Sequence, residues 1–136
     1  MPDSLAKPKT VAILGAGPVG LAAAARVLER GMTPVVLEAG PEAAHAIRQW
    51  RHVRMFSPWE YNVDEAAGRL LAGTGWNAPP PDAYPTGGDL VDQYLEPLAT
   101  RTALKDHLRT GSRVTAVARS GFDKMTRNGR AFEPFT

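Results

Sequence analysis

The feature that most restricts the fold of this chain is a run of glycines directly after its first apolar segment. Residues 11–14 are apolar and typical of a buried strand, and residues 15–20 then read Gly-Ala-Gly-Pro-Val-Gly. An alanine-rich helical segment extends to Arg30, and a second apolar strand over residues 34–37 ends at Glu38. Strand, glycine turn, helix, strand and acid, in this order, make the βαβ unit that binds dinucleotides. We therefore predict an α/β fold built on a parallel sheet.

Each glycine of the turn has a separate mechanical role in such a unit. Gly15 allows the tight turn off the strand, Gly17 lets the backbone approach a pyrophosphate closely, and Gly20 lets the helix pack on the strand. Pro18 and Val19 begin the helix, so its positive dipole end and free amides face the phosphates. A glycine-rich turn alone is a weak indication, but here its neighbours all stand at the expected spacing. The sequence therefore predicts a dinucleotide site at this turn.

Glu38 is predicted to decide which nucleotide is bound. Its carboxylate, at the end of the second strand, can accept hydrogen bonds from both ribose hydroxyls of an adenosine. That carboxylate would repel a 2'-phosphate, and Ala39 and Gly40 offer no cation where an NADP site has an arginine. We therefore predict FAD or NAD at this site rather than NADP, with Ala39 beside the cofactor.

Residues 11–38 resemble the FAD-binding fingerprint of the two-dinucleotide-domain flavoproteins, which include flavin-containing monooxygenases and pyridine nucleotide-disulfide oxidoreductases. Ala24 and Gly31 stand where that pattern has a small helix residue and a glycine at the helix end. The resemblance implies a Rossmann-like FAD/NAD(P)-binding fold of three layers around a parallel sheet. It also implies that the N-terminal fingerprint holds FAD, whereas NAD(P)H binds as the reductant at a second fingerprint.

The later part of the chain is more loosely similar to monooxygenase-type members of this group. A tryptophan-rich loop leads to Tyr-Pro-Thr-Gly at residues 84–87, which opens a helix. No second G-x-G-x-x-G follows residue 20, so the chain has one dinucleotide site at most and NAD(P)H is expected to bind outside it. We expect a polar leader over residues 1–9, followed over residues 10–136 by the N-terminal part of an FAD-binding domain that is incomplete at its C-terminal end.

The leading functional hypothesis is the FAD-binding portion of an NAD(P)H-dependent flavoprotein oxidoreductase, most like a monooxygenase and acting on a small-molecule substrate. In that case the isolated chain should be inactive, because it supplies adenosine and pyrophosphate binding rather than the chemistry. Two alternatives stay open. In the first, the chain is the start of an NAD-dependent dehydrogenase. In the second, it is a stand-alone dinucleotide-binding module without catalysis.

The resemblance implies three further cofactor contacts. In these flavoproteins the region after the second strand passes beside the pyrophosphate and the flavin ring, so Arg54 is a candidate to neutralise phosphate and Ser57 to hydrogen-bond the cofactor. A later strand lends its backbone to the adenine edge, and Val114 is the candidate for that role. The alternative is a small apolar cluster of loop aromatics with Arg54 merely solvated. The aromatic residues concerned are Trp50, Phe56 and Trp59.

Local signals place the remaining elements. Thr86 and Asp89 form a capping box pattern at the start of a helix. Apolar residues then recur at helical spacing and predict a face directed to the core. These residues are Leu90, Val91, Tyr94, Leu95 and Leu98. Residues 49–85 lack periodicity and are expected to be irregular, whereas residues 113–119 alternate enough to predict a strand anchored by Val114 and Val117.

Composition narrows the classes of function. The chain has 136 residues, of which 43% are hydrophobic and 22% charged, as in globular domains. It has no cysteine, which excludes disulfides, thiolate metal sites and a redox-active C-x-x-C within it. Its three histidines have no cysteine or carboxylate partners at ligand spacing, so no metal site is expected.

The charges are distributed unevenly along the chain. Residues 1–100 carry 8 basic and 11 acidic side chains, and residues 101–136 carry 8 and 3. The arginines of the basic tail stand singly rather than among aromatics, so we expect no nucleic-acid partner. The apolar residues 11–25 are too short and too interrupted by glycine to span a membrane, and they lack the small-residue cleavage site of a signal peptide in the expected place. We therefore expect no membrane association and a cytoplasmic location.

Overall fold

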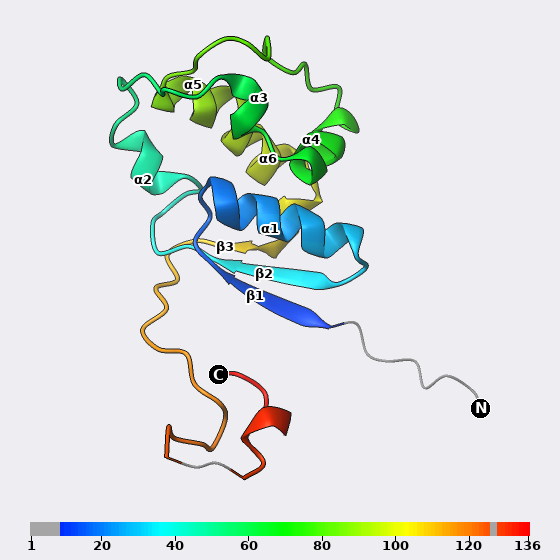
Figure 1. Cartoon of the computed structure of the whole chain (residues 1–136), viewed down its shortest axis with the longest axis vertical. Helices are drawn as coiled ribbons and strands as arrows, with labels where there is room; N and C mark the ends of the chain where they lie inside the picture. Colours follow the sequence, from blue (N-terminus) through cyan, green and yellow to red (C-terminus); the bar gives the residue numbers. More distant parts are fainter. Residues whose placement is uncertain (1–8, 126–127) are drawn as a thin grey trace, which may run out of the picture.

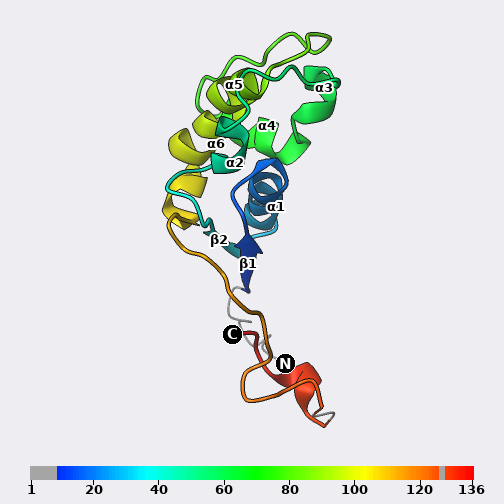
Figure 2. The same ribbon diagram turned by 90° about the vertical axis from the view of Figure 1, so that its left-hand side faces the viewer.

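Three parallel strands form the central sheet, in the order β1-β2-β3. The computed structural model of the chain describes residues 9–125 and 128–136, so the leader expected over residues 1–9 lies outside the described residues apart from Lys9. The strands are β1 (Thr10–Leu14), β2 (Thr33–Leu37) and β3 (Leu108–Arg109). Helices cover one face of this sheet (Figure 1, Figure 2). The predicted α/β fold with a parallel sheet is confirmed.

Helix α1 (Pro18–Glu29) connects β1 to β2 and packs against the sheet. Its sequence is rich in alanine, and the small side chains let the helix lie close to the strands. Four of its residues face the core. They are Leu21, Ala24, Ala25 and Val27. The helix predicted between the glycine turn and Arg30 is therefore confirmed.

The two faces of the sheet differ in how they are covered. Ile13 and Val36 are paired across β1 and β2 on the helical side, where Val36 is fully buried. Leu14 and Leu37 form the next pair and lie on the opposite face, where Leu14 is 55% exposed. A hollow of about 750 Å³ lies between this face and residues of the C-terminal segment. The core therefore sits between the sheet and the helices on one side.

The remaining helical segments follow β2, and α2 to α6 build the upper part of the molecule in Figure 1. They are α2 (His45–Arg48), α3 (Trp59–Asn62), α4 (Glu65–Ala72), α5 (Gly87–Leu90), the π-helical turn η1 (Val91–Leu95), α6 (Glu96–Arg101) and the 3-10 turns η2 (Ala103–His107) and η3 (Arg130–Phe132). Helices α3 and α4 correct the expectation that residues 49–85 are irregular. Asp64 caps α4 by accepting the N–H of Ala67 at 3.1 Å, and the helix buries one face in the core.

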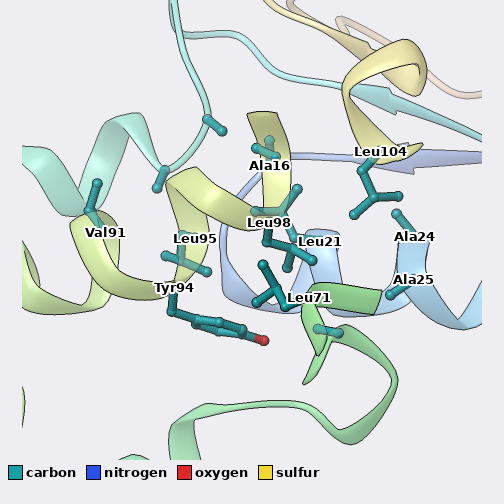
Figure 3. Packing of buried hydrophobic residues seen from close by; sticks show 14 of the residues in the cluster. Ala16, Leu21, Ala24, Ala25, Leu71, Val91, Tyr94, Leu95, Leu98 and Leu104 are labelled. Atoms are coloured by element: carbon teal, nitrogen blue, oxygen red, sulfur yellow. The ribbon is translucent and has the colours of Figure 1, made fainter. Parts of the chain in front are cut away.

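The capping box predicted before α5 is present. The Thr86 hydroxyl accepts the N–H of Asp89 at 3.1 Å, and the Asp89 carboxylate accepts the N–H of Thr86 at 2.9 Å. The apolar face that follows is buried as predicted. Its residues are Leu90, Val91, Tyr94, Leu95 and Leu98, each at most 2% exposed. Figure 3 shows several of these side chains meeting Leu21, Leu71 and Leu104 in one cluster.

This capping box should make folding stability depend on pH. Hydrogen bonds from the Thr86 backbone and side chain lower the pKa of Asp89 from its ordinary value of 3.8. The stabilisation is therefore fully present above that value and is lost as the pH falls through the lower folded-state pKa. Asp89→Asn should cost about 1 kcal/mol at neutral pH, as loss of a helix cap does.

Urea unfolding of wild type and Asp89→Asn from pH 7 to pH 2.5 measures this effect. The difference in unfolding free energy should shrink below about pH 4, whereas the exposed Asp82→Asn control should match wild type at neutral pH. A difference that stays constant down to pH 2.5 would contradict the assignment.

A proline explains how the tryptophan-rich loop is attached to the helix. Pro97 has no N–H to donate to the carbonyl of Gln93, four residues earlier. The indole N–H of Trp76 donates to that oxygen instead, at 2.6 Å. The Trp76 ring also lies against Tyr94, with ring centroids 6.3 Å apart. The loop is thereby held against the π-helical turn.

The expected cluster of loop aromatics is only partly formed. Trp59 is 4% exposed and belongs to the main core, and Trp50 packs at the edge of that core. Phe56 is 98% exposed and takes no part in it. The alternative of an apolar cluster therefore does not hold for Phe56, because a segment without periodicity does not indicate which of its faces is buried.

The strand predicted over residues 113–119 does not form. The third strand is β3, and the pairing continues past it as Glu38 donates its N–H to the Arg109 carbonyl at 2.9 Å and Ser112 donates to the Glu38 carbonyl at 2.8 Å. The free edge of β2 is therefore used by residues up to Ser112. Residues 113–118 have no regular structure, and Val117 is 59% exposed.

Candidate dinucleotide-binding site

The turn after β1 needs glycine at its first position. Gly15 has a φ of +96°, a conformation that side chains other than glycine rarely adopt. Its N–H donates to the Leu37 carbonyl at 2.8 Å, which joins the turn to the end of β2. The turn therefore lies at the carboxyl ends of two neighbouring parallel strands, where ligands bind in open α/β sheets.

Gly20 and Gly17 differ in the space around them. A Cβ at Gly20 would stand 1.9 Å from the Gly15 carbonyl oxygen, so helix and turn can approach this closely only if residue 20 is glycine. At Gly17 a Cβ would meet nothing within 4 Å, and the φ of −84° suits any residue. Gly20 is thus required by packing, whereas Gly17 borders open space in front of the helix.

The N-terminus of α1 is not capped by a side chain of its own first turn. Gly17 occupies the N-cap position without a side-chain hydrogen bond, and the first turn contains no acidic residue. Pro18 has no N–H, and Val19 is 83% exposed. The first amides of a helix have no intrahelical acceptor. This end of α1 can therefore accept a phosphate group.

Glu38 is fixed directly against the glycine turn. One carboxylate oxygen accepts the N–H of Ala16 at 2.8 Å, and the other accepts the N–H of Gly40 at 2.8 Å. A carboxylate offers about four acceptor positions, so both oxygens keep capacity for hydroxyl donors. Ala39 is exposed next to it and carries no charge. The structure thus joins an acceptor for hydroxyl groups to a helix end suited to phosphate.

Ala44 gives this turn a second support that the sequence did not indicate. Its N–H donates to the Ala16 carbonyl at 2.9 Å, so both backbone groups of Ala16 are bonded. Ala44 has a φ of +57°, unusual for a residue with a side chain. It precedes α2, and nothing in the local sequence marks an alanine for this conformation. The contact holds the start of α2 next to the predicted site.

The hydrogen bonds of Arg54 and Ser57 go to residues of the segment between α2 and α5. Arg54 is exposed and donates from Nη1 to the Tyr84 carbonyl at 2.6 Å. The Ser57 hydroxyl donates to the Asn62 side-chain oxygen at 2.8 Å. Both side chains stabilise the segment between α2 and α5, and their cofactor contacts stay predictions.

Val114 follows the end of the sheet without a hydrogen bond to it. It lies two residues after Ser112 and borders the hollow below the sheet with Leu14 and Leu37. Its backbone is therefore near the carboxyl edge of the strands, although the strand expected around it is absent. Its contact with adenine stays a prediction.

A cavity of about 650 Å³ lies along α1 next to this site, and we call it the α1 cavity. Its walls include Pro18 and Val19 from the first turn of α1, residues 60–65, Leu90 of α5 and Tyr94 of η1. A volume of this size is typical of small-molecule sites. The α1 cavity thus begins next to the predicted phosphate position at the N-terminus of α1.

Two kinds of feature are not found in the described part of the chain. Within residues 9–125 and 128–136, no three histidine or acidic side chains gather closely enough to hold a metal ion. In the same residues, no helix has the length and apolar character needed to cross a membrane.

Comparison with solved structures shows the same fold in flavoproteins. The chain is similar to an oxidized steroid monooxygenase bound to NADP, with 25% identity and a TM-score of 0.64. It is also similar to OTEMO in complex with FAD and NADP, with 20% identity and a TM-score of 0.60. A bacillithiol disulfide reductase from Bacillus cereus matches with 26% identity and a TM-score of 0.63.

These similarities include most of this chain but a small part of the other proteins. The alignments cover 83%, 83% and 85% of this chain, and 21%, 20% and 32% of the three neighbours. No protein-family model matches the chain, and no curated protein matches it by sequence. The resemblance to monooxygenase-type and disulfide-reductase flavoproteins inferred from residues 11–38 is confirmed by these structures.

Proposed function

We propose that this chain, which has the fold of the flavoprotein oxidoreductases, binds the adenosine and pyrophosphate of FAD. The observation that carries the proposal is the direct contact between Glu38 and the glycine turn. It places a carboxylate that can accept ribose hydroxyls next to an uncapped helix end that can accept phosphates. The open space at Gly17 leaves room for a pyrophosphate.

The neighbours support FAD as the cofactor, with NAD(P)H as the reductant. One of them, OTEMO, forms a complex with FAD and NADP together. At this turn NADP itself is disfavoured, since its 2'-phosphate would meet the Glu38 carboxylate with only uncharged Ala39 and Gly40 beside it. We therefore propose FAD at the glycine turn and NAD(P)H, as reductant, at residues outside this chain.

We further propose that the chain is the FAD-binding part of an NAD(P)H-dependent oxidoreductase of the monooxygenase type. When bound, the flavin supplies hydride and electron transfer between a nicotinamide and an acceptor. This chain's own residues contribute binding and orientation. This chain has no cysteine, so it does not itself contain the redox-active thiol pair of a disulfide reductase. The cytoplasmic location and the absence of nucleic-acid and membrane partners stay predictions.

Titration calorimetry with FAD, NAD and NADP on the same preparation tests the proposal. FAD should bind most tightly and NADP least, for the electrostatic reason given above. Tighter binding of NAD than of FAD would contradict the proposal and favour the start of a dehydrogenase. Tight binding of NADP would contradict the role of Glu38 itself.

The chain alone should not accelerate the oxidation of NADPH or NADH by FAD. It has one predicted dinucleotide site, so no second site holds the nicotinamide against the flavin, and such proximity is a main contribution of enzymes to this kind of reaction. Stopped-flow reduction of added FAD, with and without the chain, measures this. A saturable, chain-dependent reduction that Glu38→Arg abolishes would show that the catalytic site is contained in these residues.

A further inference from the structure

Tyr94 carries a buried hydroxyl whose proton is accepted by none of the described residues. Its side chain is 1% exposed, and its oxygen accepts the N–H of Asp64 at 3.2 Å. Among the described residues, no oxygen or nitrogen accepts the Tyr94 proton in return. Figure 3 shows the ring extending beside Leu71, with the oxygen directed away from the helix that carries it. The hydroxyl therefore keeps a hydrogen-bond donor for a molecule outside the described residues.

The position of this hydroxyl is fixed from several sides. Tyr94 lies in the π-helical turn η1, a type of distortion that is frequent at functional sites. Asp64, which donates to the hydroxyl, also caps α4 and pairs with Arg26 of α1 at 2.6 Å. Burial raises the pKa of Tyr94, so the hydroxyl keeps its proton. The group is therefore a rigid hydrogen-bond donor.

Tyr94 also lines the α1 cavity, which starts at Pro18 and Val19. If the phosphates of a ligand lie at the N-terminus of α1, the part of the ligand that follows the phosphates lies beside this cavity. An acceptor on the ligand would then receive a hydrogen bond from the Tyr94 hydroxyl, whose proton no described residue accepts. This is the contact that the buried hydroxyl lacks.

The charges around the α1 cavity indicate which part of a ligand enters it. Three carboxylates and one guanidinium line it. They are Glu60, Asp64, Glu65 and Arg26. A phosphate would be repelled by this excess of negative charge, so the phosphates belong at the helix end outside. The part that enters must carry acceptors but no negative charge, and the ribityl-flavin half of FAD has this character.

Resting on the proposed function, we infer that the flavin half of FAD enters the α1 cavity and accepts a hydrogen bond from the Tyr94 hydroxyl. This makes Tyr94 a binding residue for the part of the cofactor that ADP lacks. Glu38 and the glycine turn bind the part that the two ligands share. The contributions of the two halves of the site can thus be measured separately.

Tyr94→Phe removes the donor and keeps the ring, and calorimetric titration with FAD and with ADP separates the two halves. FAD affinity should fall roughly three- to ten-fold, the effect of one hydrogen bond, while ADP affinity should stay within about two-fold of wild type. Tyr84→Phe is the matched control, since Tyr84 is 49% exposed and lies outside the cavity lining. The affinities of Tyr84→Phe for FAD and for ADP should equal those of wild type.

An unchanged FAD affinity in Tyr94→Phe, or an equal loss for FAD and ADP, would overturn the inference while ADP binding still supports the glycine turn. Failure of the wild type to bind either ligand overturns the proposed function and the inference with it. If Tyr94→Phe does not fold, isotope-filtered NMR of the wild type with FAD decides. Cross-peaks between isoalloxazine protons and the Tyr94 ring are expected, and cross-peaks from adenine alone would overturn the inference.

Discussion

Gly20→Ala should lower the free energy of unfolding by at least about 3 kcal/mol, the upper end of the usual cost of overpacking. The new Cβ would stand 1.9 Å from the Gly15 carbonyl oxygen, and that oxygen belongs to the backbone of a tight turn. Neither the turn nor α1 can move away without breaking contacts with the sheet. The substitution should therefore displace α1 and remove the site together with the fold.

Gly17→Ala is the matched variant, because it adds the same methyl group at the N-cap of α1. Here the methyl meets no protein atom within 4 Å, and the φ of −84° is allowed for alanine. Stability should change little. FAD affinity should fall about tenfold or more, since the methyl occupies the space that a pyrophosphate needs.

Urea unfolding and FAD titration of both variants measure these effects side by side. We expect an unstable Gly20→Ala and a stable Gly17→Ala that binds poorly. Equal stability of the two variants would contradict the packing at Gly20. If Gly17→Ala folds and binds FAD as tightly as wild type, this would contradict the binding of the pyrophosphate at this turn.

Glu38→Ala should weaken FAD binding by roughly 1.5 to 3 kcal/mol, the range for hydrogen bonds to a charged group. The structure adds a second effect, because the N–H groups of Ala16 and Gly40 lose their acceptor. Each partly buried N–H without a partner costs on the order of 1 kcal/mol. The variant should therefore lose stability as well as affinity.

The neighbouring Glu42→Ala is the control for Glu38→Ala. Glu42 is exposed and pairs with Arg48 at 3.3 Å, away from the glycine turn. Calorimetry and urea unfolding of both variants should show losses for Glu38→Ala alone, since exposed ion pairs contribute little. Equal FAD affinities for the two variants would contradict the role of Glu38.

Elements with a strong local signal were predictable from the sequence. The glycine turn and α1 depend on residues adjacent in the chain, and so does the capping box of Thr86 and Asp89. The buried face after Asp89 followed from helical spacing alone. The proximity of Glu38 to the turn could also be inferred, because parallel neighbouring strands end at the same edge of the sheet.

Features that depend on distant partners were not predictable in the same way. Residues 113–119 alternate like a strand, but the edge of β2 is already used by residues 108–112. Helix α4 has a capping aspartate, yet it lies in a segment where prolines and aromatics hide its periodicity. The contact between Ala44 and Ala16 depends on a backbone angle that is unusual for alanine.

Amide chemical-shift mapping of the isotope-labelled chain with FAD tests the central claim most directly. We predict saturable shifts for Gly17, Val19, Gly20 and Ala39, with the amides of α6 unchanged. These residues surround the uncapped end of α1 and Glu38. Saturable FAD binding that leaves the amide chemical shifts of the glycine turn unchanged would contradict the claim that FAD binds at this turn. So would the absence of binding at millimolar FAD.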